Sequence, residues 1–349
     1  MSKTILVAGH NLFFINEMIN YCKGEFNILI DKWWSHDGHN KEKSLELLNK
    51  SDIIFCEWCL GNIVFYSEHK KNNQKLFVRI HRFESYELYW DKMLLDKIDK
   101  IFFVSKSWMY MHTKIKNIND INIIKKFNLL ENCLSNEFKP KNIKIIKKLS
   151  NRKKILNLGI IGINPAKRKC PLKCLPVLKE LSNRYKINFY IIGAMPQQVS
   201  WIRNQPYEIY YNEYKKDIDI FLEELKIIKN LTLIRTGIIP NKIMPKILNK
   251  LDYLLVPTSN EAMPQSSLES LMSGCVPLFY GEYVTKIEAR RNWPEMFCFN
   301  NYNEVINFID KTFNNGDIKY VKKIIEIIKK YWNTHKTETV YLKFKKFIQ

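Results

Sequence analysis

Short apolar, β-branched runs alternate with longer helical runs along most of the chain, and this alternation constrains the fold more than any other feature. The strand candidates are near-continuous apolar runs, which is typical of strands buried on both faces of a parallel sheet. Strand–helix alternation at this spacing predicts a doubly wound α/β fold. In the first half of the chain the predicted strands are 4–9, 26–31, 52–58, 75–81 and 100–105.

The alternation stops once and then restarts. Residues 139–154 contain eight basic residues and no acidic residue, so we expect an exposed basic linker. Two interpretations of this segment stay open, a solvated surface segment and a contact with an anionic membrane. The strands predicted beyond it are 155–161, 187–194, 231–237, 252–257, 275–280 and 296–300.

A chain of 349 residues is too long for one typical core and fits two domains. The sequence predicts two Rossmann-like domains, a linker, and a C-terminal helical segment that packs back towards the first domain. The predicted bounds are 1–138 for the N-terminal domain, 139–154 for the linker, 155–315 for the C-terminal domain and 316–349 for the helical segment.

The formal net charge of +21 favours anionic partners such as sugar nucleotides, anionic lipids or nucleic acid. Lysine, asparagine and isoleucine are all abundant, as an AT-rich genome would produce, so the charge does not choose among these partners. No apolar run approaches the roughly 20 residues that span a bilayer. The N-terminal run MSKTILVAGHNLFF indicates a first strand rather than a signal peptide, so we expect a cytoplasmic protein.

Two motifs could suggest metal or redox chemistry. Cys56 and Cys59 have C-x-x-C spacing, but they follow a predicted strand and no second ligand pair has suitable spacing. A structural role is therefore favoured for both cysteines. His36 and His39 are close in sequence, and a solvated polar loop explains them better than a metal pair.

Residues 257–277, PTSNEAMPQSSLESLMSGCVP, contain two glutamates in a segment otherwise without charge, Glu261 and Glu269. The segment follows a predicted strand, so it lies at the carboxyl edge of the sheet, where α/β proteins bind ligands. Pro264 suits a first helical position and Gly274 a helix stop. We therefore expect a loop that carries Glu261, followed by a helix that carries Glu269.

A helix start of this kind binds phosphate through its first amides, here from Gln265 onward. Ser266 and Ser267 add hydroxyl donors. Glu269 can accept hydrogen bonds from the vicinal hydroxyls of a ribose, and Glu261 can reach a second polyol beyond the phosphates. This arrangement describes a nucleotide-diphosphate sugar. A surface loop and a capped helix with incidental acids is the alternative.

The segment resembles the donor-binding signature of retaining glycosyltransferases, glycosyltransferase family 4 in particular. That signature has two glutamates separated by seven residues, then a small-residue helix, Gly and Pro, which here are Glu261, Glu269, Gly274 and Pro277. The resemblance implies a GT-B fold, in which two Rossmann-like domains face a central cleft and the C-terminal domain binds the donor. It also implies retention of the anomeric configuration and no metal or other cofactor.

The resemblance extends to other segments and implies roles for their residues. LGIIGINPAKRK (158–169) is similar to the loop whose basic residues bind the diphosphate. Arg168 and Lys169 match those basic residues best, and Lys167 is the second choice. VRIHRFES (78–85) is similar to the strand that ends in a histidine near the donor sugar, and VAGHN (7–11) to the acceptor-side loop. The implied catalytic residues are His81 and Glu261. The implied donor-binding residues are Arg168, Lys169, Gln265, Ser266, Ser267 and Glu269, and the acceptor-side loop is Gly9, His10 and Asn11.

The function implied is transfer of a sugar from a nucleotide sugar to a glycan or lipid-linked acceptor, in cell-surface polysaccharide assembly at the inner face of a membrane. A metal-dependent transferase would need an Asp-x-Asp at a strand end, and Asp217–Asp219 lies in a predicted helix. A sugar-nucleotide epimerase on the same fold is one alternative. A basic nucleic-acid-binding protein is another, but the lysines are spread along the whole chain rather than clustered with aromatic residues, so no nucleic acid is expected.

Overall fold

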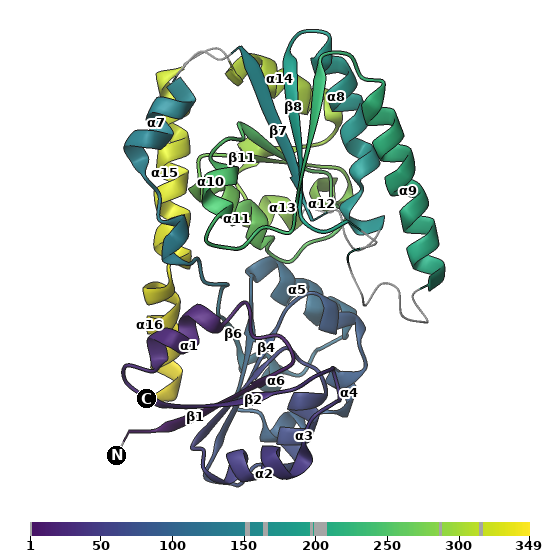
Figure 1. Cartoon of the computed structure of the whole chain (residues 1–349). Coiled ribbons are helices and arrows are strands. Elements are labelled where there is room, and N and C mark those ends of the chain that lie inside the picture. Colours follow the sequence, from purple (N-terminus) through teal and green to yellow (C-terminus); the bar gives the residue numbers. More distant parts are fainter. Residues whose placement is uncertain are drawn as a thin grey trace. The chain divides into compact units, whose positions relative to one another are not determined.

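The computed structural model of the chain describes residues 2–150, 154–162, 167–195, 198, 208–285, 288–313 and 317–349. The chain forms two compact units (Figure 1). Unit 1 comprises Met1–Asn136 together with Asn333–Gln349, and unit 2 comprises Glu137–Trp332. Each unit has its own sheet and its own core.

The sheet of unit 1 has six parallel strands in the order β2-β1-β3-β4-β5-β6. The order reverses between β1 and β3, and a doubly wound sheet has its binding crevice at such a reversal, beyond the carboxyl ends of the strands. The strands are β1 (Thr4–Gly9), β2 (Asn27–Lys32), β3 (Ile53–Glu57), β4 (Lys75–Ile80), β5 (Lys100–Phe103) and β6 (Phe127–Leu129). The helices are α1 (Asn16–Cys22), α2 (Lys41–Asn49), α3 (Gly61–His69), α4 (Tyr89–Lys92), α5 (Lys106–Ile115), α6 (Ile121–Ile124) and α16 (Thr337–Ile348).

The last helix of the chain completes the core of unit 1. α16 lies beside α1, where the rings of Tyr21 and Tyr341 are 4.9 Å apart (Figure 1). Phe344 is buried against Phe55 and Phe77 of the central strands. Truncating a buried phenylalanine costs about 3–5 kcal/mol, so unit 1 depends on this distant segment.

The sheet of unit 2 also has six parallel strands, in the order β12-β11-β10-β7-β8-β9, and its order reverses between β7 and β10. The strands are β7 (Ile155–Ile161), β8 (Lys186–Ile192), β9 (Leu231–Gly237), β10 (Tyr253–Val256), β11 (Val276–Tyr280) and β12 (Cys298–Phe299). The helices are α7 (Asn142–Ser150), α8 (Leu175–Ser182), α9 (Glu208–Lys226), α10 (Met244–Leu248), α11 (Gln265–Met272), α12 (Glu282–Thr285), α13 (Glu288–Asn292) and α14 (Tyr302–Phe313), and α15 (Ile318–His335) runs from unit 2 into unit 1.

The predicted doubly wound α/β class is confirmed, since all the predicted strands form to within two residues of their predicted ends. β6 was not predicted, because three half-buried residues at a sheet edge are too short to show a pattern. Asp217–Asp219 lies within α9, as expected. No helix in the described ranges is long and apolar enough to cross a bilayer.

Over its described length, the basic segment 139–154 belongs to unit 2. Residues 142–150 form α7, and Ile145 is buried in unit 2. Residues 151–153 lie outside the described residues. The predicted C-terminal segment is helical and is divided between the units, because α15 belongs to unit 2 as far as Trp332.

Candidate functional site

The strand order of unit 2 brings two loops together at the carboxyl edge of its sheet. β7 and β10 are adjacent strands at the point where the order reverses. The chain beyond β7 leads to a 3₁₀ turn at Lys167–Lys169, and the chain beyond β10 leads through residues 257–264 into α11. Residues 163–166 and the side chain of Lys167 lie outside the described part of the structure. The predicted donor-binding residues therefore come from neighbouring strand ends.

Hydrogen bonds fix the two loops to each other. The carbonyl oxygen of Arg168 accepts hydrogen bonds from Thr258 Oγ1 and from the Ser259 amide, both at 2.9 Å. Thr258 is buried, so water competes little for these bonds. The 3₁₀ turn is thus held against the loop that carries Glu261.

Glu261 forms an ion cluster with two cations. Its Oε1 accepts a hydrogen bond from Lys169 Nζ at 2.7 Å and another from the Arg168 guanidinium. The three side chains are between 12% and 23% exposed, and partial burial strengthens their attraction. One carboxylate faces two cations, which leaves a net positive charge for an anionic ligand.

The start of α11 lies beside this cluster. Its N-cap, Pro264, has an extended backbone and offers no side-chain cap. Uncapped amides and the helix dipole make such a start favourable for anions. Lys169, Pro264 and Ser266 line one small cavity of about 10 Å³, enough for one water molecule. Ser267 is fully buried, and its Oγ has no hydrogen-bond partner among the described residues.

Glu269 lies one turn into α11 and is 8% exposed. Burial raises the pKa of its carboxyl group to about 7, and the hydrogen bond from Gln265 Nε2 to Oε1, at 3.3 Å, opposes that shift. The helix ends at Gly274, whose φ of +74° is the left-handed conformation that favours glycine. Glu269 is thus a carboxyl group that changes its charge near neutral pH.

In unit 1, the predicted acceptor-side loop likewise lies at the reversal in strand order, where β1 and β3 end. Gly9 packs so closely on β3 that an added Cβ would lie 2.7 Å from the Glu57 carbonyl oxygen, which excludes other residues there. Asn11 accepts a hydrogen bond from Trp58 Nε1 at 2.8 Å through its carbonyl oxygen. The ring of His10 is 5.8 Å from Trp58, and burial lowers the His10 pKa. The predicted acceptor-side loop therefore packs on the end of β3.

His81, at the end of β4, is held by several contacts. Its Nε2 is 2.9 Å from Glu57 Oε1, and its amide donates to Glu84 Oε1 at 3.0 Å. Its ring stacks on Trp58 with 4.1 Å between centroids. His81 is buried, and these contacts set both its backbone and its ring orientation.

Sequence reasoning missed the residues that surround His81. Glu57, Arg79 and Glu84 are fully buried, and Arg79 Nε lies 3.7 Å from Glu57 Oε2. Trp58 has a φ of +71°, which costs energy in a bulky residue, and strained residues of this kind cluster at functional sites. The sequence did contain one signal for two of them. Each predicted strand begins with a charged residue, and beyond that residue DIIFCEW contains one acidic residue, Glu57, and KLFVRIH contains one arginine, Arg79.

The other motifs pack beside the site of unit 1, where the Cys59 amide donates a hydrogen bond to Glu84 Oε1 at 3.2 Å. Cys56 and Cys59 are buried, and burial raises the pKa of both thiols, which opposes thiolate chemistry. The ring of His39 stacks on Trp33 at 3.8 Å, whereas the ring of His36 is 5.0 Å from His10. Within the described ranges, no group of three or more His, Cys, Asp and Glu side chains could hold a metal ion.

No protein-family model matches the chain, and no curated protein matches it. Solved structures do match over nearly its full length. HepE from Anabaena in complex with UDP-glucose is 9% identical, with 99% of each chain covered and a TM-score of 0.70. A glycosyltransferase from Rickettsia africae is 15% identical, with 99% of this chain and 97% of that chain covered and a TM-score of 0.67.

A third match is the sucrose-phosphate synthase from Thermosynechococcus elongatus, which is 11% identical, with 99% of this chain and 98% of that chain covered and a TM-score of 0.63. At such identities the likeness establishes the fold. The chain has the GT-B fold, two parallel six-stranded sheets with their helices.

Proposed function

We propose that the protein is a retaining glycosyltransferase of the family 4 type, which transfers a sugar from a nucleotide-diphosphate sugar to a glycan or lipid-linked acceptor. The observation that carries this proposal is the cluster of Arg168, Lys169 and Glu261 beside the uncapped start of α11, at the reversal in strand order of a GT-B fold. A structure with this fold, HepE, is a complex with UDP-glucose.

We expect the ion pairs of this cluster to change when the donor binds. Arg168 and Lys169 are neutralised in part by Glu261. A diphosphate carries more negative charge than a single carboxylate and draws both cations to itself. Glu261 then becomes available to the sugar hydroxyls, while the first amides of α11 and Ser266 hold the phosphates. The same groups stabilise the charge that develops on the leaving diphosphate.

We assign the ribose of such a donor to Glu269, which lies one turn into α11 beyond the proposed phosphate position. Its ionised form accepts hydrogen bonds from both ribose hydroxyls, so donor binding favours the deprotonated carboxyl group. In unit 1, His81 contacts the transferred sugar, and Gly9, His10 and Asn11 face the acceptor. These roles use positioning and electrostatics, and we propose that the reaction needs no metal ion or other cofactor.

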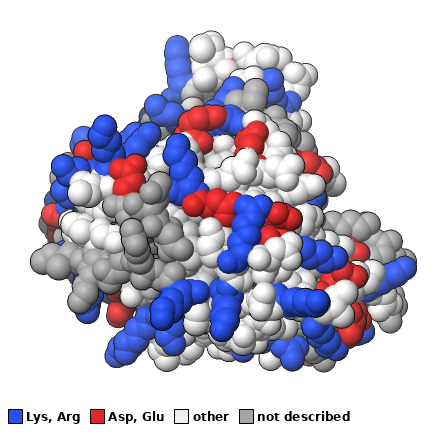
Figure 2. Space-filling model, turned by 90° about the horizontal axis from the view of Figure 1, so that it is seen from above, with Lys and Arg blue, Asp and Glu red and all other residues white. Residues whose placement is uncertain are grey.

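A sugar-nucleotide epimerase on the same fold would bind the same donor without transferring its sugar. Nucleic-acid binding is the less favoured alternative. On the face seen in Figure 2, lysine and arginine side chains are spread among acidic and uncharged residues rather than gathered in one stripe. A nucleic-acid site would need such a concentration, together with stacking aromatic residues.

We further propose that the enzyme is cytoplasmic and associates loosely with the inner face of a membrane during assembly of a cell-surface polysaccharide. The basic residues of the segment 139–154 support this association, because they are attracted to anionic lipids. Sedimentation with anionic vesicles at low salt tests it. An absence of binding under those conditions removes the membrane part of the proposal.

The test of the proposed reaction is release of nucleoside diphosphate from a panel of sugar nucleotides, each with and without candidate glycan acceptors. A transferase releases diphosphate in an acceptor-dependent manner and forms a product with the donor's anomeric configuration, which NMR determines. An epimerase instead converts the donor in the absence of acceptor. An inverted product would refute retention, and no turnover of any donor would refute the transferase.

A further inference from the structure

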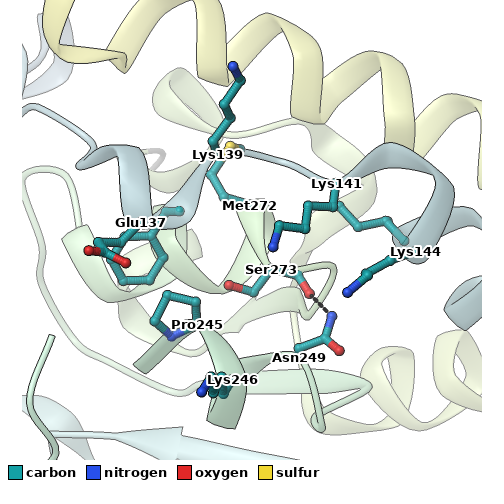
Figure 3. Close-up of a pocket in the computed structure, with 11 residues that line it drawn as sticks. Glu137, Lys139, Lys141, Lys144, Pro245, Lys246, Asn249, Met272 and Ser273 are labelled. Carbon is teal, nitrogen blue, oxygen red and sulfur yellow. Dashed lines mark hydrogen bonds between the residues drawn. The ribbon is translucent and has the colours of Figure 1, made fainter. Parts of the chain in front are cut away.

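Unit 2 has a second concave site, away from the candidate donor site. A pocket of about 230 Å³ lies among α7, α10 and α11, before the amino ends of β10 and β11 (Figure 3). Met272 and Ser273, at the C-terminal end of α11, form part of its wall. Eight residues of α helix separate this end from the start of α11, which is about 12 Å at 1.5 Å per residue. The two sites are therefore separate.

Lysine residues dominate the charge of this pocket. Lys139, Lys141, Lys144 and Lys246 line it, and Glu137 is the single acidic residue among its lining residues. In the described part of the chain, no hydrogen bond or ion pair involves these four ammonium groups. Figure 3 shows Lys141 and Lys144 extending towards Ser273 and Asn249, while Lys246 lies on another side of the pocket.

A simpler explanation is that the lysines neutralise the carbonyl groups at the ends of α10 and α11. Other groups already perform that role. Lys148, on α7, donates to the carbonyl oxygen of Leu251, and Asn249 Nδ2 donates to that of Ser273 at 3.1 Å. The lysines in the pocket are additional to these contacts.

The pocket wall is built from packed residues. Ile145, on the inner side of α7, is buried against Gly274, where an added Cβ would lie 3.2 Å from its side chain. Ser273 Oγ donates to the carbonyl oxygen of Glu269 at 2.9 Å, which fixes this serine in the wall. The segment with Lys141 and Lys144 therefore packs in a defined position against the end of α11.

We propose that this pocket binds a phosphate group. Lys141 and Lys144 extend towards the same wall, whereas Lys139 extends away from it (Figure 3). Two like charges on one side of a pocket repel each other, and a compact multivalent anion relieves that repulsion while accepting charge-assisted hydrogen bonds. A neutral sugar or an apolar group would leave the positive charge of these lysines uncompensated. The phosphate could belong to a soluble metabolite or to a lipid headgroup, and both present the same chemistry to the lysines.

Calorimetric titration with inorganic pyrophosphate tests the proposal. The double variant Lys141→Gln/Lys144→Gln removes two of the facing charges. The matched control Lys186→Gln/Lys229→Gln removes the same charge from exposed positions in unit 2 that do not line the pocket. We expect the pocket variant to lose one binding event or weaken it about tenfold, and the control to bind like the wild type. Equal thermal midpoints show that both variants fold.

Two further arms identify the site and the source. Arg168→Gln/Lys169→Gln alters the candidate donor site and leaves the pocket event unchanged, so failure of the donor assignment is distinct from failure of this one. Vesicles containing phosphatidic acid replace pyrophosphate in the second arm. Binding to either probe that depends on Lys141 and Lys144 supports the proposal. Equal binding by the pocket variant and its control, with both probes, overturns it.

Discussion

Glu57 and His81 meet at the ends of neighbouring strands, with Oε1 of Glu57 2.9 Å from Nε2 of His81. Both side chains are buried, and the other Glu57 oxygen faces Arg79. The carboxylate thus fixes the orientation of the histidine, while Arg79 balances its charge. Glu57 is a positioning residue for His81 in the proposed reaction.

Replacing Glu57 with glutamine should reduce turnover through His81. A misplaced catalytic group costs about a hundredfold, so we expect a loss of that order for Glu57→Gln and for His81→Ala. The double variant should be no slower than His81→Ala, because Glu57 acts through that histidine. Donor affinity, measured by calorimetry, should stay unchanged. Losses that multiply in the double variant would contradict the positioning role.

The two glutamates of the donor segment should separate binding from turnover. Glu269→Ala removes the acceptor for the ribose hydroxyls, so we expect nucleotide affinity to fall about tenfold or more. Glu261→Ala should lower kcat more than affinity, because Arg168 and Lys169 remain to hold the diphosphate. Steady-state kinetics with calorimetry measure both effects. Unchanged parameters in both variants would remove the site assignment.

The raised pKa of Glu269 predicts a pH dependence of stability. The folded-state pKa is about 7, against an ordinary value of 4.5, so the folded state retains this proton as pH rises between those values and the unfolded state loses it. Stability from this group is full below pH 4.5 and is lost as pH rises through 7, by about 3 kcal/mol in total.

Glu269→Gln should abolish that component, because a neutral amide does not titrate. Between pH 5 and pH 8 the free energy of unfolding should therefore fall less for Glu269→Gln than for the wild type, as urea titration measures. Glu223→Gln, at an exposed position, is the control. Parallel pH profiles for all three proteins would show that Glu269 is not buried in a neutral form.

Gly274 provides a test of how α7 is seated. Alanine there meets both a φ of +74° and a contact of 3.2 Å with Ile145. Gly281 has a φ of +89°, and its nearest atoms are 3.5 Å or more from an added Cβ, so Gly281→Ala reports the backbone cost alone, about 1 kcal/mol. We expect Gly274→Ala to destabilise unit 2 more than Gly281→Ala. If chemical denaturation showed the same loss in free energy of unfolding for both variants, the side chain of Ile145 would move aside without an energetic cost.

The two sheets followed from the sequence, because near-continuous apolar runs mark buried parallel strands. In residues 257–277, Pro264 and Gly274 predicted a loop and then a helix with its stop, and both form, although Pro264 is the N-cap rather than the first helical residue. The ion cluster did not follow, since Lys169 and Glu261 are 92 positions apart and meet only when β7 and β10 become neighbours. The roles of these residues remain predictions.

Two other features were beyond local patterns. The excess of lysine in 139–154 concealed a helix, because the burial of Ile145 depends on Gly274, which is distant in the sequence. Glu57 and Glu84 are acidic side chains that the fold buries around His81, and burial of an acidic side chain is a tertiary property. The residues that contact them come from different strands and turns, so the spacing of residues along the sequence does not predict these contacts.

The most direct test of the central claim is thermal stabilisation of the chain by a panel of nucleotides and sugar nucleotides. A ligand at a hundred times its dissociation constant adds about 2.7 kcal/mol, enough to raise the midpoint by several degrees. We predict a clear shift with one sugar nucleotide and a smaller shift with its bare diphosphate, both reduced in Glu269→Ala. No shift with any of these ligands would contradict the assignment of unit 2 as a nucleotide-sugar site.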